Sequence, residues 1–327
     1  MKAICMGVLI MDMFPEQYGV PLAHVTKWLP MAGGAPANVA VALQRMGVET
    51  AYWGQVGDDA FGLEIIKRLQ DFGVDTASIR KDAIRRTTLN FHAKPTKDET
   101  EYLFYRNPGA DTAFEVSQIE LDKLAEVSVL HFDALCLTDA PMRDSTYKAV
   151  AAAREAGCII SFDVNYRSAI WPGQETAVRR TRDMLPHCDV VKLNQEEAAL
   201  LYPGYKDERV IDMLLSQGPQ IVLLTLGERG SLAAQGDLRI FTPSLTVPVA
   251  DTIGCGDAYA AGFLYGVMTL GLWTGNADAE KLKCCAAYGT ALAACTAQRK
   301  GALEALPDRA AFFEQYNRLN TFLKESV

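Results

Sequence analysis

Residues 251–263 read DTIGCGDAYAAGF, a polar, glycine-rich turn that runs directly into an apolar stretch. Gly254 and Gly256 permit backbone conformations that residues with a Cβ resist, and a helix is expected to begin near Asp257. The free N–H groups at such a helix start point at one spot, and the helix dipole adds positive potential there. The pattern predicts an anion-binding turn, followed by a buried helix over 258–273.

The acidic residue in this turn needs its own explanation, because a bound anion would repel it. The role that fits Asp257 is to take a proton from a hydroxyl group that attacks phosphorus, so it is a candidate general base. The alternative is that Asp257 only caps the helix or occupies its first turn. The spacing alone leaves both interpretations open.

The chain around this turn predicts a sheet. Its apolar runs do not alternate with polar residues, which is typical of strands buried on both faces. Stretches with helical character separate these runs. This order predicts an α/β fold with a mostly parallel central sheet and right-handed crossovers, whose ligands bind beyond the carboxyl ends of the strands. The expected strands are 127–132, 158–164, 188–193 and 220–226, and the expected helices are 141–156, 174–186 and 207–217.

One region breaks this rhythm. Residues 87–94 and 101–108 flank a polar turn and predict a β-hairpin off the main sheet. Together with the stretch after the first strand, which lacks helical periodicity, they predict a small β-sheet lid from about 13–32 and 84–115. We expect all 327 residues to form a single domain, because no linker or repeat interrupts them.

The bulk composition narrows the class of protein. The chain is 49% hydrophobic with a net charge of −8, which argues against nucleic acid or an anionic membrane as the main partner. The opening MKAICMGVLIM is followed by Asp12 and by no cleavage site, so it predicts a buried first strand. Eight cysteines without a C-x-x-C pair and without an export signal predict reduced thiols and a cytoplasmic location.

A second glycine-rich stretch precedes a helix of small residues at 32–47. Gly33 and Gly34 would let a ligand lie against the backbone, and Asn38 could bind its hydroxyl groups. Asp12, at the end of the first strand, could accept two adjacent sugar hydroxyls. The alternative is a plain helix-start turn with Asn38 as its capping amide.

Two later strand ends offer further candidates. Asn194 and Glu197 share a face of a helix start and suit indirect Mg²⁺ binding, through waters, beside ATP phosphates; N-capping is the alternative. Thr225, Gly227 and Gly230 follow a buried strand and could line a nucleotide, or form an ordinary β-turn.

Two arginines are candidate contacts for an anion or a sugar oxygen. Arg167 follows the end of a strand, where sites of α/β folds form, and Arg106 lies in the expected hairpin. Taken alone, each is more often a surface residue.

In order and content these motifs resemble the PfkB (ribokinase-like) carbohydrate kinase family over essentially the whole chain. The stretches at 251–263 and 32–47 are similar to two signatures of that family, and VGDDAFG (56–62), KLNQEE and TLGERG match in the expected order. The resemblance implies a Rossmann-like α/β/α sandwich with a small β lid. It also implies ATP-dependent phosphorylation of a sugar primary hydroxyl, with Mg²⁺.

The resemblance implies a role for each motif. Asp257 would be the catalytic base, beside an anion hole at Gly254, Cys255 and Gly256. The implied sugar contacts are Asp12, Gly33, Gly34, Asn38, Arg106, Arg167 and Asp257. The implied ATP contacts are Asn194, Thr225, Gly227, Gly230, Gly254 and Gly256. Indirect Mg²⁺ binding falls to Asn194 and Glu197, and a K⁺ loop would use backbone oxygens near Asp251, Ile253, Thr296, Arg299 and Gly301.

Within the family, FYRNPGAD (104–111) and DVNYRSAIW (163–171) resemble fructokinases, so fructose is the expected substrate. Three departures leave the sugar and the cation open: Val8 replaces a frequent Glu, HFDALCLT lacks a Gly-Ser pair, and Ala305 replaces a side-chain oxygen. The alternatives are 2-keto-3-deoxygluconate, ribose or a nucleoside, and, in another class, a non-catalytic sugar-sensing protein.

The expected lid also predicts a contact between subunits. A lid sheet with one apolar face often meets its counterpart in a dimer. Tyr102, Phe104 and Trp28 could supply such a face, so a homodimer through the lid is expected.

Overall fold

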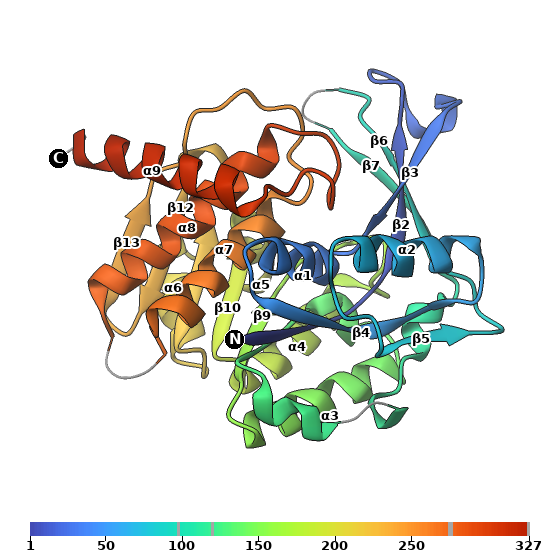
Figure 1. Cartoon of the computed structure of the whole chain (residues 1–327), viewed down its shortest axis with the longest axis horizontal. Coiled ribbons are helices and arrows are strands. Elements are labelled where there is room, and N and C mark those ends of the chain that lie inside the picture. The colour runs from blue at the N-terminus through green and yellow to red at the C-terminus, as the bar shows by residue number, and fades with distance from the viewer. Residues whose placement is uncertain (97–98, 119–120, 274–276, 326–327) are drawn as a thin grey trace.

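The computed structural model describes residues 1–96, 99–118, 121–273 and 277–325 (Figure 1). A nine-stranded sheet forms its centre, parallel from β11 to β5 and antiparallel at the β12–β13 edge. The predicted α/β fold is therefore confirmed. In spatial order the strands are β13 (Leu238–Thr242), β12 (Ser231–Gln235), β11 (Ile221–Thr225), β10 (Val190–Asn194), β9 (Ile159–Asp163), β8 (Val129–Asp133), β1 (Lys2–Met6), β4 (Glu49–Gly57) and β5 (Ile79–Asp82).

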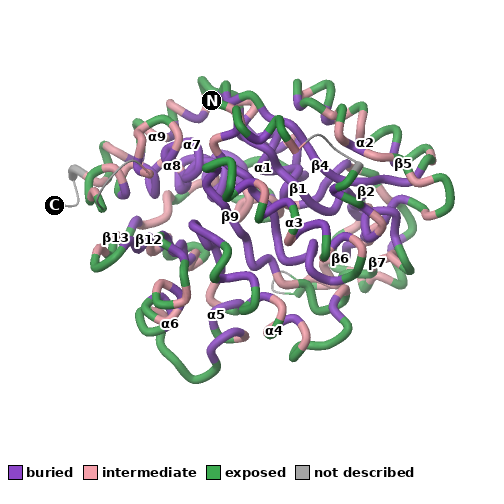
Figure 2. Tube along the Cα trace, turned by 90° about the horizontal axis from the view of Figure 1, so that it is seen from below, coloured by how far each residue is buried: buried purple, intermediate pink, exposed green. Residues whose placement is uncertain are grey.

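Alternate residues of the strands pack against two separate helical layers. In β1, Ala3 and Cys5 join one buried cluster, and Ile4 and Met6 join the other. Figure 2 shows these central strands and α1 as buried, and the outer surfaces of α2 and α6 as largely exposed. One layer contains α1 (Ala35–Arg45), α2 (Ala60–Asp71), α7 (Cys255–Leu270), α8 (Ala279–Ala297) and α9 (Arg309–Glu325), and the other contains α3 (Met142–Glu155), α4 (Gln174–Met184), α5 (Gln195–Leu201) and α6 (Asp207–Leu215).

Helix α7 is buried over most of its length, as its apolar sequence predicts. Its glycines let α8 approach closely, because a Cβ at Gly262 would lie 2.5 Å from the carbonyl oxygen of Tyr288. A Cβ at Gly266 would lie 2.8 Å from Cys285 Sγ. This packing fixes the start of α7 at the carboxyl edge of the sheet. Within the described residues, no helix has the length and apolar character needed to cross a membrane.

Four strands form a second, smaller sheet that projects from one end of the molecule (Figure 1). It contains the predicted hairpin and is the lid sheet. The parallel pair β2–β6 lies at its centre, with antiparallel strands outside. Its spatial order is β3 (Trp28–Gly33), β2 (Ile10–Pro15), β6 (Thr88–Ala93) and β7 (Glu101–Tyr105).

The structure corrects one expectation about this lid. Its first strand begins at Ile10, so Asp12 belongs to the lid and not to the end of the first strand, which is Met6. The break occurs at Gly7, where a Cβ would lie 2.7 Å from the ring of Pro36. Apolar residues continue on both sides of Gly7, so the sequence gives no sign that the chain changes sheets there.

Candidate active site

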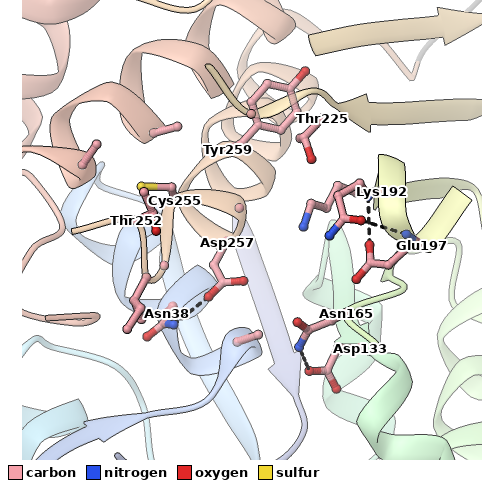
Figure 3. A pocket seen from close by; sticks show the side chains of 18 of the residues that line it. Asn38, Asp133, Asn165, Lys192, Glu197, Thr225, Thr252, Cys255, Asp257 and Tyr259 are labelled. Atoms are coloured by element: carbon pink, nitrogen blue, oxygen red, sulfur yellow. Dashed lines mark hydrogen bonds between the residues drawn. The ribbon is translucent and has the colours of Figure 1, made fainter. Parts of the chain in front are cut away.

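A cavity of about 900 Å³ lies at the carboxyl edge of the main sheet and is closed on one side by the lid sheet. The strands create its polar wall, because each of four neighbours ends in a polar residue. These residues are Asp133, Asp163, Asn194 and Thr225. Three of them line the cavity, and Asp163 is instead paired with Lys192, which does line it. The start of α7 faces this wall, as Figure 3 shows.

The turn before α7 has the geometry of an anion-binding site. Gly254 has a φ of 79°, a left-handed conformation that glycine adopts without strain, and α7 begins at the next residue. The N–H groups of Gly256 and Asp257 lie in the first turn and have no acceptor within the helix. The turn therefore offers backbone donors and the positive end of a helix dipole to the cavity.

Asp257 lines the cavity at this turn. Its Oδ2 accepts a hydrogen bond of 2.6 Å from Nδ2 of Asn38 (Figure 3). Burial raises the pKa of the Asp257 carboxyl from 3.8 to about 6, although the charge of Lys192 acts in the opposite direction. Asp257 is thus mostly ionised at neutral pH and retains a usable affinity for a proton, which a general base needs.

A buried ion pair lies next to the turn, and sequence reasoning missed it. Nζ of Lys192 donates to both carboxylate oxygens of Asp163, at 2.8 and 3.1 Å. Burial opposes the charge on Lys192, but Asp163, Glu197 and Asp257 outweigh it and raise the lysine pKa. A Cβ at Gly256 would lie 3.0 Å from Lys192 Nζ, so a permanent positive charge borders the anion-binding turn. The sequence did contain a signal for this pair, because Asp163 and Lys192 are charged residues within the apolar runs CIISFDV and CDVVKL.

The lid contributes a polar cluster on the opposite side of the cavity. Oδ1 of Asp12 accepts a bond of 2.8 Å from Asn90 Nδ2 and lies 2.6 Å from His92 Nε2. A Cβ at Gly33 would lie 2.2 Å from Asp12 Oδ2, so Gly33 makes room for this carboxylate. Sequence reasoning missed Asn90 and His92, which alternate on one strand of the hairpin and so face the same side.

Two residues that line the cavity, Asn38 and Asn90, each have a buried amide oxygen, Oδ1, without a hydrogen-bond partner among the described residues. Such groups are costly to bury unless something donates to them. Gly34, which starts α1 with a φ of 121°, borders the same space. This end of the cavity is therefore built to bind hydroxyl groups.

A second carboxyl group faces this space from the main sheet. Asn165 Nδ2 donates to Asp133 Oδ2 at 2.8 Å, and both residues line the cavity (Figure 3). Burial raises the pKa of Asp133 to about 7. Asn165 has a φ of 33°, a strained conformation of a kind that gathers at functional sites. Sequence reasoning missed both residues, although Asn165 lies inside the quoted DVNYR motif.

Only one of the two candidate arginines lines the cavity. Arg167 is exposed and lines the cavity rim. The Arg106 side chain is buried outside the cavity lining, with Nε 2.7 Å from Asp111 Oδ2 and NH1 2.9 Å from Thr138 Oγ1. These contacts engage the guanidinium of Arg106 with Asp111 and Thr138, away from the residues that line the cavity.

The other end of the cavity contains the candidate nucleotide residues. Asn194 caps α5 in a reciprocal arrangement with Glu197, with both bonds at 2.8 Å. The other carboxylate oxygen of Glu197 accepts the N–H of Tyr166 at 2.9 Å. The capping alternative is therefore what the structure displays, while both side chains still line the cavity. Thr225, Gly227 and Gly230 also line it.

The residues expected to hold K⁺ lie beside the anion-binding turn. Asp251 is buried, and its Oδ1 accepts the N–H groups of Thr252 at 2.8 Å and Ile253 at 3.3 Å. The carbonyl oxygen of Thr296 accepts the N–H of Arg299 at 3.1 Å, and Gly301 has a φ of 94°. In the part of the chain that the structure describes, no group of three or more His, Cys, Asp or Glu side chains could hold a metal ion.

Comparison with known proteins gives a consistent result. Residues 1–309 match the model of the pfkB family carbohydrate kinases. The chain is 33% identical over 314 residues to the probable fructokinase-6, chloroplastic, of Arabidopsis thaliana, covering 95% of this chain and 81% of that protein.

Solved structures resemble the whole chain. Fructokinase with bound ATP from Xylella fastidiosa superposes with a TM-score of 0.88 at 28% identity, over 98% of this chain and 99% of that one. Fructokinase from Vibrio cholerae O395, with fructose, ADP and calcium ion bound, gives a TM-score of 0.84 at 28% identity, over 96% and 98%.

Proposed function

The chain belongs to the pfkB family of carbohydrate kinases, and from that membership we propose that it transfers the γ-phosphoryl group of ATP to the 6-hydroxyl of fructose. The observation that carries the proposal is the position of Asp257. Its carboxylate lies at the anion-binding turn and in the same cavity as the hydroxyl-binding cluster around Asp12. A phosphoryl acceptor and a phosphoryl donor can therefore meet at one carboxylate.

The residues act in a defined order. Asp12, Asn38 and Asn90 bind sugar hydroxyls, because all three residues line this end of the cavity. The amide oxygens of Asn38 and Asn90 have no protein partner in the described chain, so these side chains can still gain a hydrogen bond. The Asp257 carboxylate, which accepts a hydrogen bond from Asn38, also accepts one from the primary hydroxyl of the sugar and takes its proton as that oxygen bonds to the γ-phosphorus. The bond between the γ-phosphorus and the β,γ-bridging oxygen breaks, and ADP leaves. The N–H groups of Gly256 and Asp257 and the ammonium of Lys192 offset the charge of the transferring group.

The charge of the acceptor end favours a neutral sugar. Asp12, Asp133 and Asp257 all line it. Of the nearby cations, Lys192 is paired with Asp163, and Arg167 is exposed at the rim. An acidic acceptor such as 2-keto-3-deoxygluconate would meet the like charge of Asp12 and Asp257, which costs binding free energy. Fructose has no such penalty.

ATP and Mg²⁺ belong at the other end of the cavity. Both oxygens of Glu197 and the Oδ1 of Asn194 already accept backbone N–H groups, so these side chains fit Mg²⁺ only through water molecules. When bound, Mg²⁺ neutralises phosphate charge. Thr225, Gly227 and Gly230 are the proposed contacts of the nucleotide.

The lid sheet also offers a surface for a homodimer, which we propose on a corrected set of residues. Tyr102 and Phe104 line the cavity and so do not form the outer face. On that face the ring of Phe91 packs edge-on against Trp28 at 4.9 Å and Tyr105 at 5.5 Å. Tyr105 is 62% exposed, which leaves an apolar surface for a second copy.

Two further proposals concern the setting of the enzyme. A cytoplasmic location is supported by the eight cysteines, all of which are unpaired thiols. The net charge of −8 supports small molecules, not nucleic acid, as the partners. We also retain the interpretation of the chain as one catalytic domain with its lid.

A panel of acceptors tests the proposal. ADP release is measured with ATP, Mg²⁺ and fructose, ribose, 2-keto-3-deoxygluconate or adenosine, with Asp257→Asn as the matched control. We expect kcat/KM for fructose to exceed every other value by about tenfold or more, the scale of discrimination that paired hydroxyl contacts provide. A higher value for another acceptor would overturn the choice of sugar. Fructose binding in calorimetry without any turnover would favour the sugar-sensing alternative.

A further inference from the structure

An ion pair joins the lid sheet to the anion-binding turn. Lys94, the residue after β6, places its Nζ 3.1 Å from Oδ1 of Asp251. The Asp251 side chain is only 5% exposed, and Lys94 is 28% exposed. The two residues are 157 positions apart in the sequence, so only the folded chain brings them together.

Asp251 organises the turn that leads to the catalytic carboxylate. The same Oδ1 that meets Lys94 also accepts the N–H groups of Thr252 and Ile253. These bonds fix the backbone immediately before Gly254, whose conformation starts α7. The position of Asp257 thus depends on a carboxylate that is itself buried.

A buried carboxylate needs a positive charge, because removing it from water without a partner is costly. The resemblance to ribokinase-like enzymes implies a monovalent cation near Asp251, yet here an ammonium group already lies against that carboxylate. A free cation at the same oxygen would be repelled by Lys94. The donor set around Asp251 therefore does not fit a cation that relies on this carboxylate.

We propose that Lys94 is a positioning residue that holds the anion-binding turn through Asp251, in place of a free monovalent cation at this carboxylate. The proposal rests on the kinase activity proposed above, but not on which sugar is phosphorylated. It also links the turn to the lid, because Lys94 directly follows the strand that contains Asn90 and His92. A separate contact joins the lid region to the segment after α8: Nζ of Lys300 lies 4.9 Å from the ring centre of Tyr18.

Salt dependence of the kinase reaction gives the first test. Wild type and Lys94→Met are assayed in KCl and in tetramethylammonium chloride at equal ionic strength, and kcat and KM are compared. We expect wild-type kcat to differ by less than about twofold between the two salts. For Lys94→Met in tetramethylammonium we expect kcat to fall by about 10- to 100-fold, the effect of a small displacement of catalytic groups, with KCl restoring part of it.

The matched control is Lys27→Met, which removes the same charge from an exposed position immediately before β3 of the same lid sheet. It should behave as wild type in both salts. Strong dependence of the wild type on KCl would overturn the proposal, and so would a Lys94→Met variant that matches wild type in both salts.

Hydrogen exchange provides a readout that needs no substrate. Lys94→Met should speed exchange in both the lid strands β6 and β7 and the turn at 251–257, while β8 and β9 stay as protected as in wild type. Unchanged exchange in the turn would contradict the coupling. Because this measurement involves no turnover, it separates failure of the Lys94 proposal from failure of the proposed function.

Discussion

The most informative single change is Asp257→Asn, because it alters the proposed base and little else. Asn and Asp have nearly the same shape, and the new side chain can still accept the hydrogen bond that Asn38 donates at 2.6 Å. The variant removes a group that can accept a proton from the sugar hydroxyl. The fold, the anion-binding turn and the nucleotide end remain.

The structure sets the expected size of the effect. With a pKa of about 6, roughly nine-tenths of Asp257 is ionised at pH 7, so the wild type has its base in the active form. Loss of a general base typically costs about 10²- to 10⁴-fold in rate, or roughly 3–5 kcal/mol of barrier. We expect kcat to fall by about that factor while the KM for ATP changes by less than about threefold.

Asp257→Asn should not lower the thermal stability of the protein, although it lowers kcat. The raised pKa means that the folded protein holds the proton more tightly than the unfolded chain, so ionising Asp257 destabilises the fold as pH rises through the interval from 3.8 to about 6. This difference in pKa means that ionised Asp257 lowers the free energy of unfolding by at most about 3 kcal/mol at neutral pH. Asp257→Asn carries no charge and should therefore unfold at the same temperature as wild type or higher.

The assay combines steady-state ADP release with thermal unfolding of the same preparations at pH 7. An inactive variant that is as stable as wild type supports the role of Asp257 as base. Turnover above about a tenth of wild type would refute it, because removing a base that contributes 10²-fold or more must lower kcat by more than tenfold.

Other perturbations give separate expectations. In the wild type, kcat/KM for fructose should fall as pH falls through about 6, because Asp257 gains a proton, and a profile that stays flat to pH 5 would contradict the assignment. Asp12→Asn should raise the KM for fructose by about 10- to 150-fold and leave that for ATP unchanged, since a charged acceptor contributes roughly 1.5–3 kcal/mol; equal changes in both constants in steady-state assays would show a general defect. Gly256→Ala places a Cβ 3.0 Å from Lys192 Nζ and should lower kcat by about tenfold, whereas normal kcat would show that Lys192 moves freely. Glu197→Gln should raise the Mg²⁺ concentration needed for half-maximal activity, measured by titration, and an unchanged requirement would remove Glu197 from the Mg²⁺ site.

The main sheet was predictable from sequence because it is set by strong local patterns. The four apolar runs from 127 to 226 became β8 to β11, since unbroken Val, Ile and Leu runs fit strands buried on both faces. The turn at 251–263 also formed as expected, because the positive φ of Gly254 is a local property of that residue. The lid hairpin followed from its polar turn.

The polar groups that face one another across the cavity were less predictable. Lys192 and Asp163 sit on different strands, and their pairing depends on the parallel register between β9 and β10. His92 and Asp12 meet only because the chain changes sheets at Gly7, which an uninterrupted apolar sequence conceals. Arg106 shows the converse, since the sequence could not reveal that Asp111 and Thr138 would take its donors.

The most direct test is a crystal structure with fructose and a non-hydrolysable ATP analogue bound. We predict that a carboxylate oxygen of Asp257 will lie within about 2.6–3.2 Å of the 6-hydroxyl oxygen of fructose. A complex in which Asp257 stays bonded to Asn38 and no sugar oxygen comes within hydrogen-bonding distance of it would contradict the account.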